Sequence, residues 1–256
     1  MTPRTFTNVW SPQLRNRRDI DVYLPPSYSA GRDRFPVVYM QDGQNLSDPR
    51  TAFAGTWELD AALERLAERG VQPIVVGIHH AGAARLAEYS PFPDRRHRGG
   101  QGDAYLAFIV DTLKPRVDRL FRTRAARDAT AILGSSMGGL ISLYAFFRYP
   151  SVFGAAGIMS PSIWFGQGAV LDFIQEARPP RGRLYLDVGR HEGAGTLRDA
   201  RRLARLLVRK GFKRDKRRAS SARSAQRLRY VEDPDGRHGE WDWARRLDDA
   251  LEFLLS

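Results

Sequence analysis

The chain has no cysteine among its 256 residues. Disulfide bonds, thiolate metal sites and cysteine nucleophiles are therefore excluded. It also has no apolar run near the roughly 20 residues that a membrane-spanning helix needs, and no apolar, signal-type stretch follows Met1. We therefore expect a cytoplasmic protein without a transmembrane segment.

Lysine is scarce, since only four of the 41 basic residues are lysine and the rest are arginine. The formal net charge of +12 would suit a nucleic-acid-binding protein, but it is concentrated in one place. Residues 209–229 hold ten basic residues and one acid, a charge of +9 that leaves +3 for the rest of the chain. We therefore interpret residues 209–227 as a basic loop insertion that joins two elements, and we do not expect nucleic acid as a partner. An anionic partner or an acidic membrane surface is the alternative.

Short β-rich runs alternate with longer helical patterns, and the hydrophobic content of 42% is enough for a sizeable core. Residues 18–24 alternate polar with apolar side chains, which predicts a half-exposed antiparallel strand paired with one at residues 6–10. The later strands are continuous apolar runs, as expected of a parallel sheet that helices cover on both faces. These runs are residues 37–41, 74–78, 130–133, 154–159 and 184–188.

Apolar residues at helical spacing fill the gaps between these strands. The predicted helices cover residues 59–66, 105–113, 140–147, 197–208 and 243–255. The sequence therefore predicts an α/β protein with a mainly parallel central sheet and helices on both faces. We find no linker that would divide the chain, and we expect one domain over residues 1–256.

Residues 134–138, Gly-Ser-Ser-Met-Gly, contain a G-x-S-x-G pattern centred on Ser136. Chance alone should produce this pattern in about one chain in ten of this length. Its position is more specific, because it follows the apolar strand at residues 129–133 and opens the helix near Leu140. A strand, a sharp turn and a helix are what a nucleophile elbow requires. Ser136 is our candidate nucleophile, with the Met137 amide as an oxyanion donor; an inert serine in a glycine-rich turn is the alternative.

A serine nucleophile needs a histidine to accept its proton. His238 lies in a loop before the final helix and follows both the serine and the acid in the chain, the order found in such hydrolases. Capping of that helix is the alternative role, and His191 is the rival base. The orienting carboxylate should follow the strand at residues 184–188. Glu192 is best placed, with Asp187 inside the strand as the rival acid and a surface ion pair as the alternative role for Glu192.

A polar turn with a glycine follows the first central strand, at residues 42–45. A second N–H donor to the oxyanion usually comes from this loop. Gln44 is our choice for that donor, and an ordinary strand-ending turn is the alternative.

Taken together, these motifs resemble the family of α/β-hydrolases known as putative esterases. That family includes feruloyl esterases, enterochelin-type siderophore esterases, S-formylglutathione hydrolases and mycolyltransferases. The resemblance covers nearly the whole chain. The segments that carry it are, in order, residues 22–25, 42–45, 85–91, 118–123, 134–139 and 160–164, followed by His238 and Trp241.

The resemblance implies an α/β-hydrolase fold without a large lid domain, and a carboxylic-ester substrate. It implies Ser136, Glu192 and His238 as a catalytic triad, and Gln44 and Met137 as oxyanion donors. It implies neither a metal nor an organic cofactor. The chain departs from the family in having Glu where many relatives have Asp, and in its basic insertion.

Aromatic side chains lie in the loops expected to wall an open pocket, and they suit an acyl or aryl group. Trp57, Tyr89 and Trp164 are our candidates for substrate binding, with plain core packing as the alternative for each. The sequence thus predicts a serine esterase that acts on a small-molecule ester, and it leaves the oligomeric state open. The rival functions are an acyltransferase on the same scaffold and a binding module that uses residues 209–229.

Overall fold

The computed structural model describes residues 3–215 and 226–256. Its centre is a sheet of parallel strands. They are β3 (Val37–Gln41), β4 (Ile74–Ile78), β7 (Thr130–Ser135), β8 (Ala155–Met159), β9 (Gly182–Gly189), β11 (Gln226–Asp233) and the short β10 (Lys213–Arg214). Of these strands, β3, β4, β7, β8 and most of β9 are buried. All five predicted apolar runs form central strands, so the prediction of a mainly parallel sheet is confirmed.

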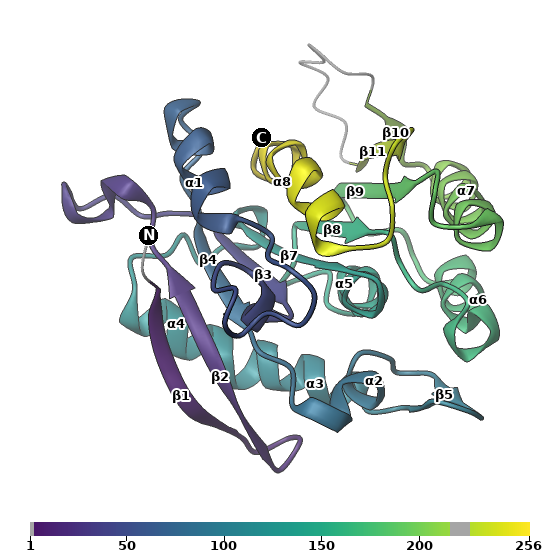
Figure 1. Cartoon of the computed structure of the whole chain (residues 1–256), viewed down its shortest axis with the longest axis horizontal. Coiled ribbons are helices and arrows are strands. Elements are labelled where there is room, and N and C mark those ends of the chain that lie inside the picture. The colour runs from purple at the N-terminus through teal and green to yellow at the C-terminus, as the bar shows by residue number, and fades with distance from the viewer. Residues whose placement is uncertain (1–2, 216–225) are drawn as a thin grey trace.

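An antiparallel hairpin extends one edge of this sheet. It consists of β1 (Arg4–Ser11) and β2 (Asn16–Tyr23), and β2 pairs antiparallel with β4. The complete order is β1-β2-β4-β3-β7-β8-β9-β11-β10, and Figure 1 shows the hairpin at the purple end of the sheet. The antiparallel pair expected from the alternation in residues 18–24 is therefore confirmed.

Helices cover both faces of the sheet (Figure 1). One face carries α1 (Leu59–Glu68) and α8 (Glu240–Leu255). The other face carries α3 (Gly102–Ala107), α4 (Lys114–Leu120), α5 (Met137–Arg148), α6 (Ala169–Glu176) and α7 (Ala194–Arg209). Alternate residues of one strand therefore enter different cores, as Val38 and Tyr39 of β3 do. The fold is that of an α/β-hydrolase, without a large extra domain in the part of the chain that is described.

Several short elements were not predicted. The helical pattern at residues 105–113 continues from α3 into a π-helical stretch, Phe108–Leu113. The other unpredicted elements are α2 (Arg85–Glu88), α4, α6, β10, a hairpin of the two-residue strands β5 (Pro93–Asp94) and β6 (Arg98–Gly99), and 3₁₀ turns at Pro26–Ser29, Gly43–Asn45, Gly82–Ala84, Arg127–Ala129 and Phe165–Gly168.

The basic insertion is described only in part. Lys213 and Arg214 form the edge strand β10, which pairs parallel with β11. Asp215 then forms an ion pair with Arg227 at 2.5 Å. The flanks of the predicted loop are therefore held on the sheet, and residues 216–225 lie outside the described residues. None of the described helices is long and apolar enough to cross a membrane.

Candidate active site

Ser136 occupies a sharp turn between β7 and α5. Its φ of 54° and ψ of −120° lie where residues with a side chain are strained. The turn is held by two backbone hydrogen bonds, from Ser136 N–H to Met159 C=O at 2.9 Å and from Ser162 N–H to Ser136 C=O at 3.0 Å. This geometry is that of a nucleophile elbow, which projects the hydroxyl above the sheet.

The two glycines of the motif allow the elbow to pack against β3. A Cβ atom on Gly134 would lie 2.7 Å from Cγ of Gln41, and one on Gly138 would lie 2.9 Å from Cβ of Gln41. Both separations are shorter than real Cβ contacts, so a larger residue would push the elbow away from the neighbouring strand. The glycine spacing therefore has a packing cause.

His238 joins Ser136 to Glu192. Its Nε2 lies 3.0 Å from Oγ of Ser136, and its Nδ1 lies 2.8 Å from Oε2 of Glu192. Because an ionised carboxylate can only accept, Nδ1 carries the proton and Nε2 is left to accept one from the serine. The three residues come from the start of α5, the turn after β9 and the loop before α8, so the structure brings all three predicted residues together.

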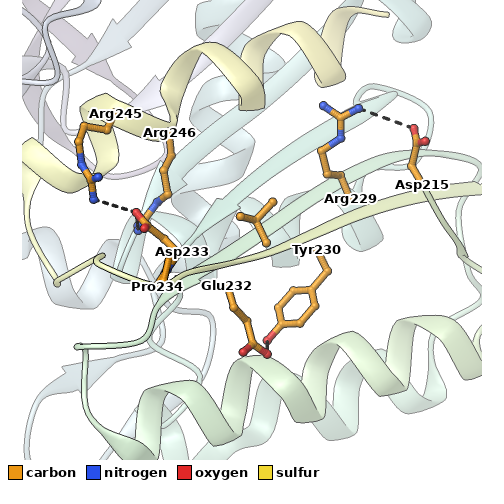
Figure 2. A pocket seen from close by; sticks show the side chains of 9 residues that line it. Asp215, Arg229, Tyr230, Glu232, Asp233, Pro234, Arg245 and Arg246 are labelled. Carbon is orange, nitrogen blue, oxygen red and sulfur yellow. Dashed lines mark hydrogen bonds and ion pairs between the residues drawn. The ribbon is translucent and has the colours of Figure 1, made fainter. Parts of the chain in front are cut away.

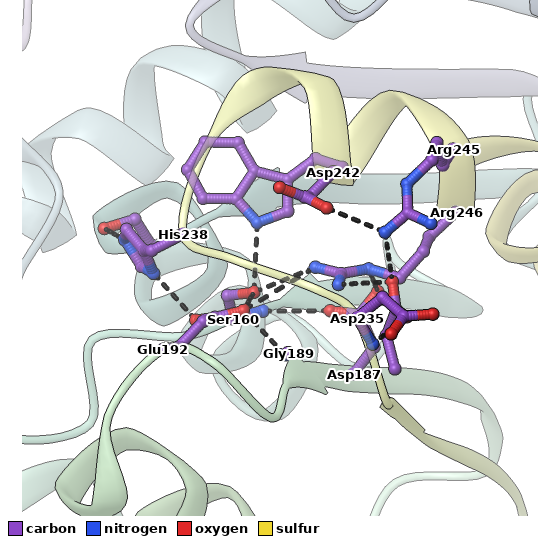
Figure 3. Close-up of polar contacts among 12 residues, drawn as sticks. Ser160, Asp187, Gly189, Glu192, Asp235, His238, Asp242, Arg245 and Arg246 are labelled. Carbon is purple, nitrogen blue, oxygen red and sulfur yellow. Dashed lines mark hydrogen bonds and ion pairs between the residues drawn. The ribbon is translucent and has the colours of Figure 1, made fainter.

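The acid is buried while the base is accessible. The side chain of Glu192 is 0% exposed and that of His238 is 41% exposed. Oε1 of Glu192 accepts hydrogen bonds from Gly189 N–H at 2.7 Å and from the Ser160 hydroxyl at 2.5 Å. The ring of Trp243 lies edge-on to His238, with centroids 5.1 Å apart. Figure 3 shows His238 above Glu192, and Ser160 on the far side of the carboxylate.

The two rival residues lie elsewhere in the arrangement. Asp187 is fully buried in β9 and forms an ion pair with Nε of Arg246 at 2.9 Å. Burial raises the pKa of Asp187 to about 7. His191 is exposed, and its backbone N–H donates to Gly236 C=O. The geometry thus pairs His238 with Glu192 rather than with Asp187.

The two predicted oxyanion donors lie at the starts of the helical segments that follow β3 and β7, which are neighbours in the sheet. Met137 is the first residue of α5, so its N–H is one of the four that have no acceptor within the helix. Gln44 lies in the 3₁₀ turn Gly43–Asn45, whose first internal hydrogen bond runs from Asn45 N–H to Asp42 C=O. Among the described residues, neither amide N–H therefore has an acceptor inside its own helix or turn.

The turn that carries Gln44 packs tightly on β4. A Cβ atom on Gly43 would lie 2.6 Å from the carbonyl carbon of Gly77, which excludes any larger residue there. The side-chain carbonyl of Gln44 accepts the backbone N–H of His80 at 3.3 Å. Burial lowers the pKa of the His80 imidazole. These contacts fix the turn against the neighbouring strand.

Two of the three aromatic candidates are buried, so their prediction as substrate contacts needs correction. Trp57 is 2% exposed and packs against Trp243 beneath α1 and α8. Tyr89 is 0% exposed, and its hydroxyl accepts the backbone N–H of Asp42 at 3.1 Å. The alternative of core packing holds for both. Trp164, in contrast, is 51% exposed.

Two other exposed aromatic residues follow predicted site residues in the chain, Phe53 after Gln44 and Trp241 after His238. Phe53 is 91% exposed, and its backbone N–H is bonded to the side chain of Asn45. Trp241 is 63% exposed, three residues after His238. A cavity of about 260 Å³ opens beside Trp164. Its lining residues are Ile163, Trp164, Gln167, Gly168, Leu171, Asp199 and Arg202.

Sequence reasoning missed the polar residues that surround the triad. Oγ of Ser162 lies 3.1 Å from Oγ of Ser136. Ser160, Trp243 and Arg246 surround the buried acid. Ser160 and Ser162 belong to a segment that the family resemblance marked, but no spacing rule connects them with α8.

A larger hollow of about 620 Å³ lies between β11 and α8, shown in Figure 2. Its charged side chains already have partners, as Arg245 has Asp233 at 2.9 Å and Glu232 has Arg201 at 2.7 Å. Arg246 lines this hollow and also lies 3.7 Å from Oε1 of Glu192. Within residues 3–215 and 226–256, no group of three or more His, Asp or Glu side chains could hold a metal ion.

Comparison with known proteins finds an esterase family and proteins named as esterases. The sequence profile of a family described as "Putative esterase" matches residues 11–254. The uncharacterized protein YbbA of Bacillus subtilis is 32% identical over 213 residues, which cover 78% of this chain and 81% of YbbA. A siderophore triacetylfusarinine C esterase of Aspergillus fumigatus is 31% identical over 148 residues, 55% of this chain and 49% of that protein. A solved ferulic acid esterase superimposes with a TM-score of 0.74 at 19% identity, covering 100% of this chain and 99% of that one.

Proposed function

This chain belongs to the putative esterase family and is a carboxylic ester hydrolase, and from that premise we propose that Ser136, His238 and Glu192 are its catalytic triad. The observation that carries the proposal is the continuous chain of contacts, 3.0 Å and 2.8 Å long, from the strained Ser136 through His238 to a buried carboxylate. Three side chains from distant parts of the sequence have no structural need for this alignment.

In the proposed reaction, His238 Nε2 takes the Ser136 proton as Oγ attacks the ester carbonyl carbon. The N–H groups of Met137 and Gln44 stabilise the resulting oxyanion, a contribution of about 3 kcal/mol per donor in comparable enzymes. The imidazolium then gives its proton to the leaving alcohol, which departs and leaves an acyl-enzyme. Water then attacks the acyl carbon as His238 takes its proton. The imidazolium returns that proton to Oγ of Ser136, and the carboxylic acid product is released.

The surroundings of Ser136 favour esters with an aryl or other apolar group. Phe53, Trp164 and Trp241 are exposed. Phe53 is held by its backbone N–H to the side chain of Asn45, in the turn that carries Gln44. Trp164 and Trp241 follow Ser162 and His238 closely in the chain. Exposed aromatic residues of this kind mark ligand-binding surfaces. The relatives named as a siderophore esterase and a ferulic acid esterase are consistent with this assignment.

Labelling with a fluorophosphonate probe tests the nucleophile without knowledge of the natural substrate. The wild-type protein should gain one probe mass per chain, and Ser136→Ala should gain none while keeping its thermal unfolding temperature. A panel of p-nitrophenyl esters, from acetyl to aryl acyl groups, then reports turnover. Absence of labelling in folded wild-type protein, or residual turnover in Ser136→Ala, would overturn the assignment.

Glu192→Gln tests the acid with little change of shape. An amide can donate as well as accept, so it no longer imposes the Nδ1-protonated form of His238. The corresponding change in serine proteases costs about 10⁴ in kcat, and a loss of at least 10³ is expected here. Asp172→Asn serves as the comparison, since Asp172 is an exposed residue of α6, and it should keep the activity.

A further inference from the structure

Ser160 has the features of a residue held in one orientation. It follows β8 directly, is 0% exposed and has a φ of 43°, in the left-handed region that serine rarely adopts. Its backbone N–H points at Asp187, with contacts of 3.0 Å to the carbonyl oxygen and 3.1 Å to Oδ1. The backbone is therefore fixed by β9, and the hydroxyl has little freedom to move away.

Three polar side chains surround this hydroxyl. Nε1 of Trp243 lies 3.0 Å from Oγ, Nη2 of Arg246 lies 3.1 Å away, and Oε1 of Glu192 lies 2.5 Å away. Figure 3 shows these contacts converging on Ser160. Tryptophan and arginine nitrogens can only donate, and a hydroxyl oxygen has two lone pairs and one proton. Both lone pairs are therefore occupied, and the single proton has only Glu192 as its acceptor.

We propose that Ser160 is a positioning residue for the esterase reaction: Trp243 and Arg246 lock its hydroxyl as a donor to Glu192, which holds that carboxylate as an acceptor toward His238. The proposal rests on the proposed triad. With Oε1 occupied by Ser160 and by Gly189 N–H, Oε2 is the oxygen that remains for Nδ1 of His238. Trp243 and Arg246, both in α8, then set which atom donates and which accepts in each hydrogen bond from Ser160 to Ser136.

Arg246 is the charged donor among the groups that fix the Ser160 hydroxyl. It is 6% exposed, and its guanidinium lies 2.9 Å from Asp187, 3.2 Å from Asp233 and 3.7 Å from Oε1 of Glu192. A buried carboxylate is costly unless a cation and hydrogen bonds compensate it. Arg246 is a cation close to Glu192, but its guanidinium lies beyond hydrogen-bond distance of that carboxylate. The Ser160 hydroxyl bridges the gap, because it accepts from Arg246 and donates to Glu192.

The rate constant for fluorophosphonate labelling, followed by intact mass, measures the reactivity of Ser136 independently of any substrate. Ser160→Ala removes the donor and keeps the carboxylate, so labelling should slow by about 10- to 100-fold, less than the roughly 10⁴ expected of a wrong histidine tautomer. Ser142→Ala is the matched control. Its hydroxyl is also fully buried and has no hydrogen-bond partner among the described residues, and its loss should leave the labelling rate unchanged.

A double-mutant cycle separates a positioning role from a merely structural one. If Ser160 acts through Glu192, then Ser160→Ala should slow labelling far less in the Glu192→Gln background than in the wild type. Equal slowing in both backgrounds, or no slowing in either, would overturn the proposal. The proposed function fails differently, through an unlabelled wild type, and this proposal would then fall with it.

Trp243→Phe covers the case in which Ser160→Ala does not fold. It keeps the ring against His238 and frees one lone pair of Ser160. Labelling should slow by about fivefold, the equivalent of one ordinary hydrogen bond, and this effect should also disappear in the Glu192→Gln background. An unchanged labelling rate in Trp243→Phe would show that the hydroxyl is not locked by its donors.

Discussion

Asp42 and Arg85 form a two-point ion pair that ties the turn carrying Gln44 to the next strand–helix connection. Nε of Arg85 lies 2.7 Å from Oδ1 of Asp42, and Nη2 lies 2.8 Å from Oδ2. Asp42 has a φ of 55° and precedes the turn that carries Gln44. Paired hydrogen bonds of this kind fix orientation as well as distance, so Arg85 holds the strained start of the turn in place.

Replacing Arg85 should therefore lower activity through the turn that it holds, and not through a contact between Arg85 and the substrate. In Arg85→Met we expect kcat on a p-nitrophenyl ester to fall by tenfold or more, toward the roughly 100-fold cost of losing an oxyanion donor outright. KM should change little. Arg50→Met is the control in the following loop, because Arg50 is 88% exposed and pairs only with Asp48. Equal kcat in both variants would show that the ion pair does not support the turn.

The strained backbone at Ser136 leads to a prediction about stability. A φ of 54° with a ψ of −120° is a conformation that glycine adopts far more readily than alanine. Ser136→Gly and Ser136→Ala should both be inactive, but Ser136→Gly should be the more stable by about 1 kcal/mol, or some 2–4 °C in Tm. Differential scanning calorimetry of the two variants measures this; equal unfolding temperatures would mean that the elbow stores no strain.

The proposed triad could be selected from the sequence because each member is marked by a local pattern. Ser136 stands in a short motif between an apolar strand and a helix, and His238 and Glu192 lie in turns at the same end of the sheet. The carboxyl ends of parallel strands lie at the same end of the sheet, so the turns that follow these strands are expected to meet there. Burial was not predictable in the same way, because Trp57 and Tyr89 lie in loops whose path depends on tertiary packing.

The support for the triad had no local signal. Ser160, Glu192 and Arg246 are separated by 32 and 54 residues, and they meet only because α8 crosses β8 and β9. The helix α6 was missed for a different reason. It has only eight residues, fewer than the window of about 11–18 residues over which a helical periodicity is recognised.

Trp164 is the aromatic candidate that stays accessible, and its removal should affect binding. For an aryl ester, Trp164→Ala should raise KM by about tenfold with little change in kcat, since one aromatic contact contributes about 1.5 kcal/mol at most. An acetyl ester should be affected far less. Trp10→Ala is the control, because Trp10 is similarly exposed at 46% but lies on the edge strand β1. A similar change in KM in both variants would remove Trp164 from the substrate site.

The buried Asp187 should make stability depend on pH in an unusual direction. Burial raises its pKa from 3.8 to about 7, and the buried cation that pairs with it, Arg246, is shared with Asp233 and Glu192. Between about pH 4 and pH 7 the folded protein thus holds a proton that the unfolded chain has released. The contribution of this group therefore favours folding at low pH, declines through that window and stays low above pH 7.

Asp187→Asn removes this titration while keeping the shape of the side chain. Near pH 5 the wild-type side chain is neutral in the folded protein, as asparagine is. Near pH 8 it is charged, so the variant should gain about 2–3 kcal/mol in free energy of unfolding relative to wild type between these pH values. Urea unfolding of both proteins at pH 5 and pH 8 measures the change, with Asp172→Asn as the control, since Asp172 is an exposed residue of α6. A difference that stays constant with pH would mean that Asp187 remains ionised beside Arg246, and that Arg246 alone balances the buried carboxylates.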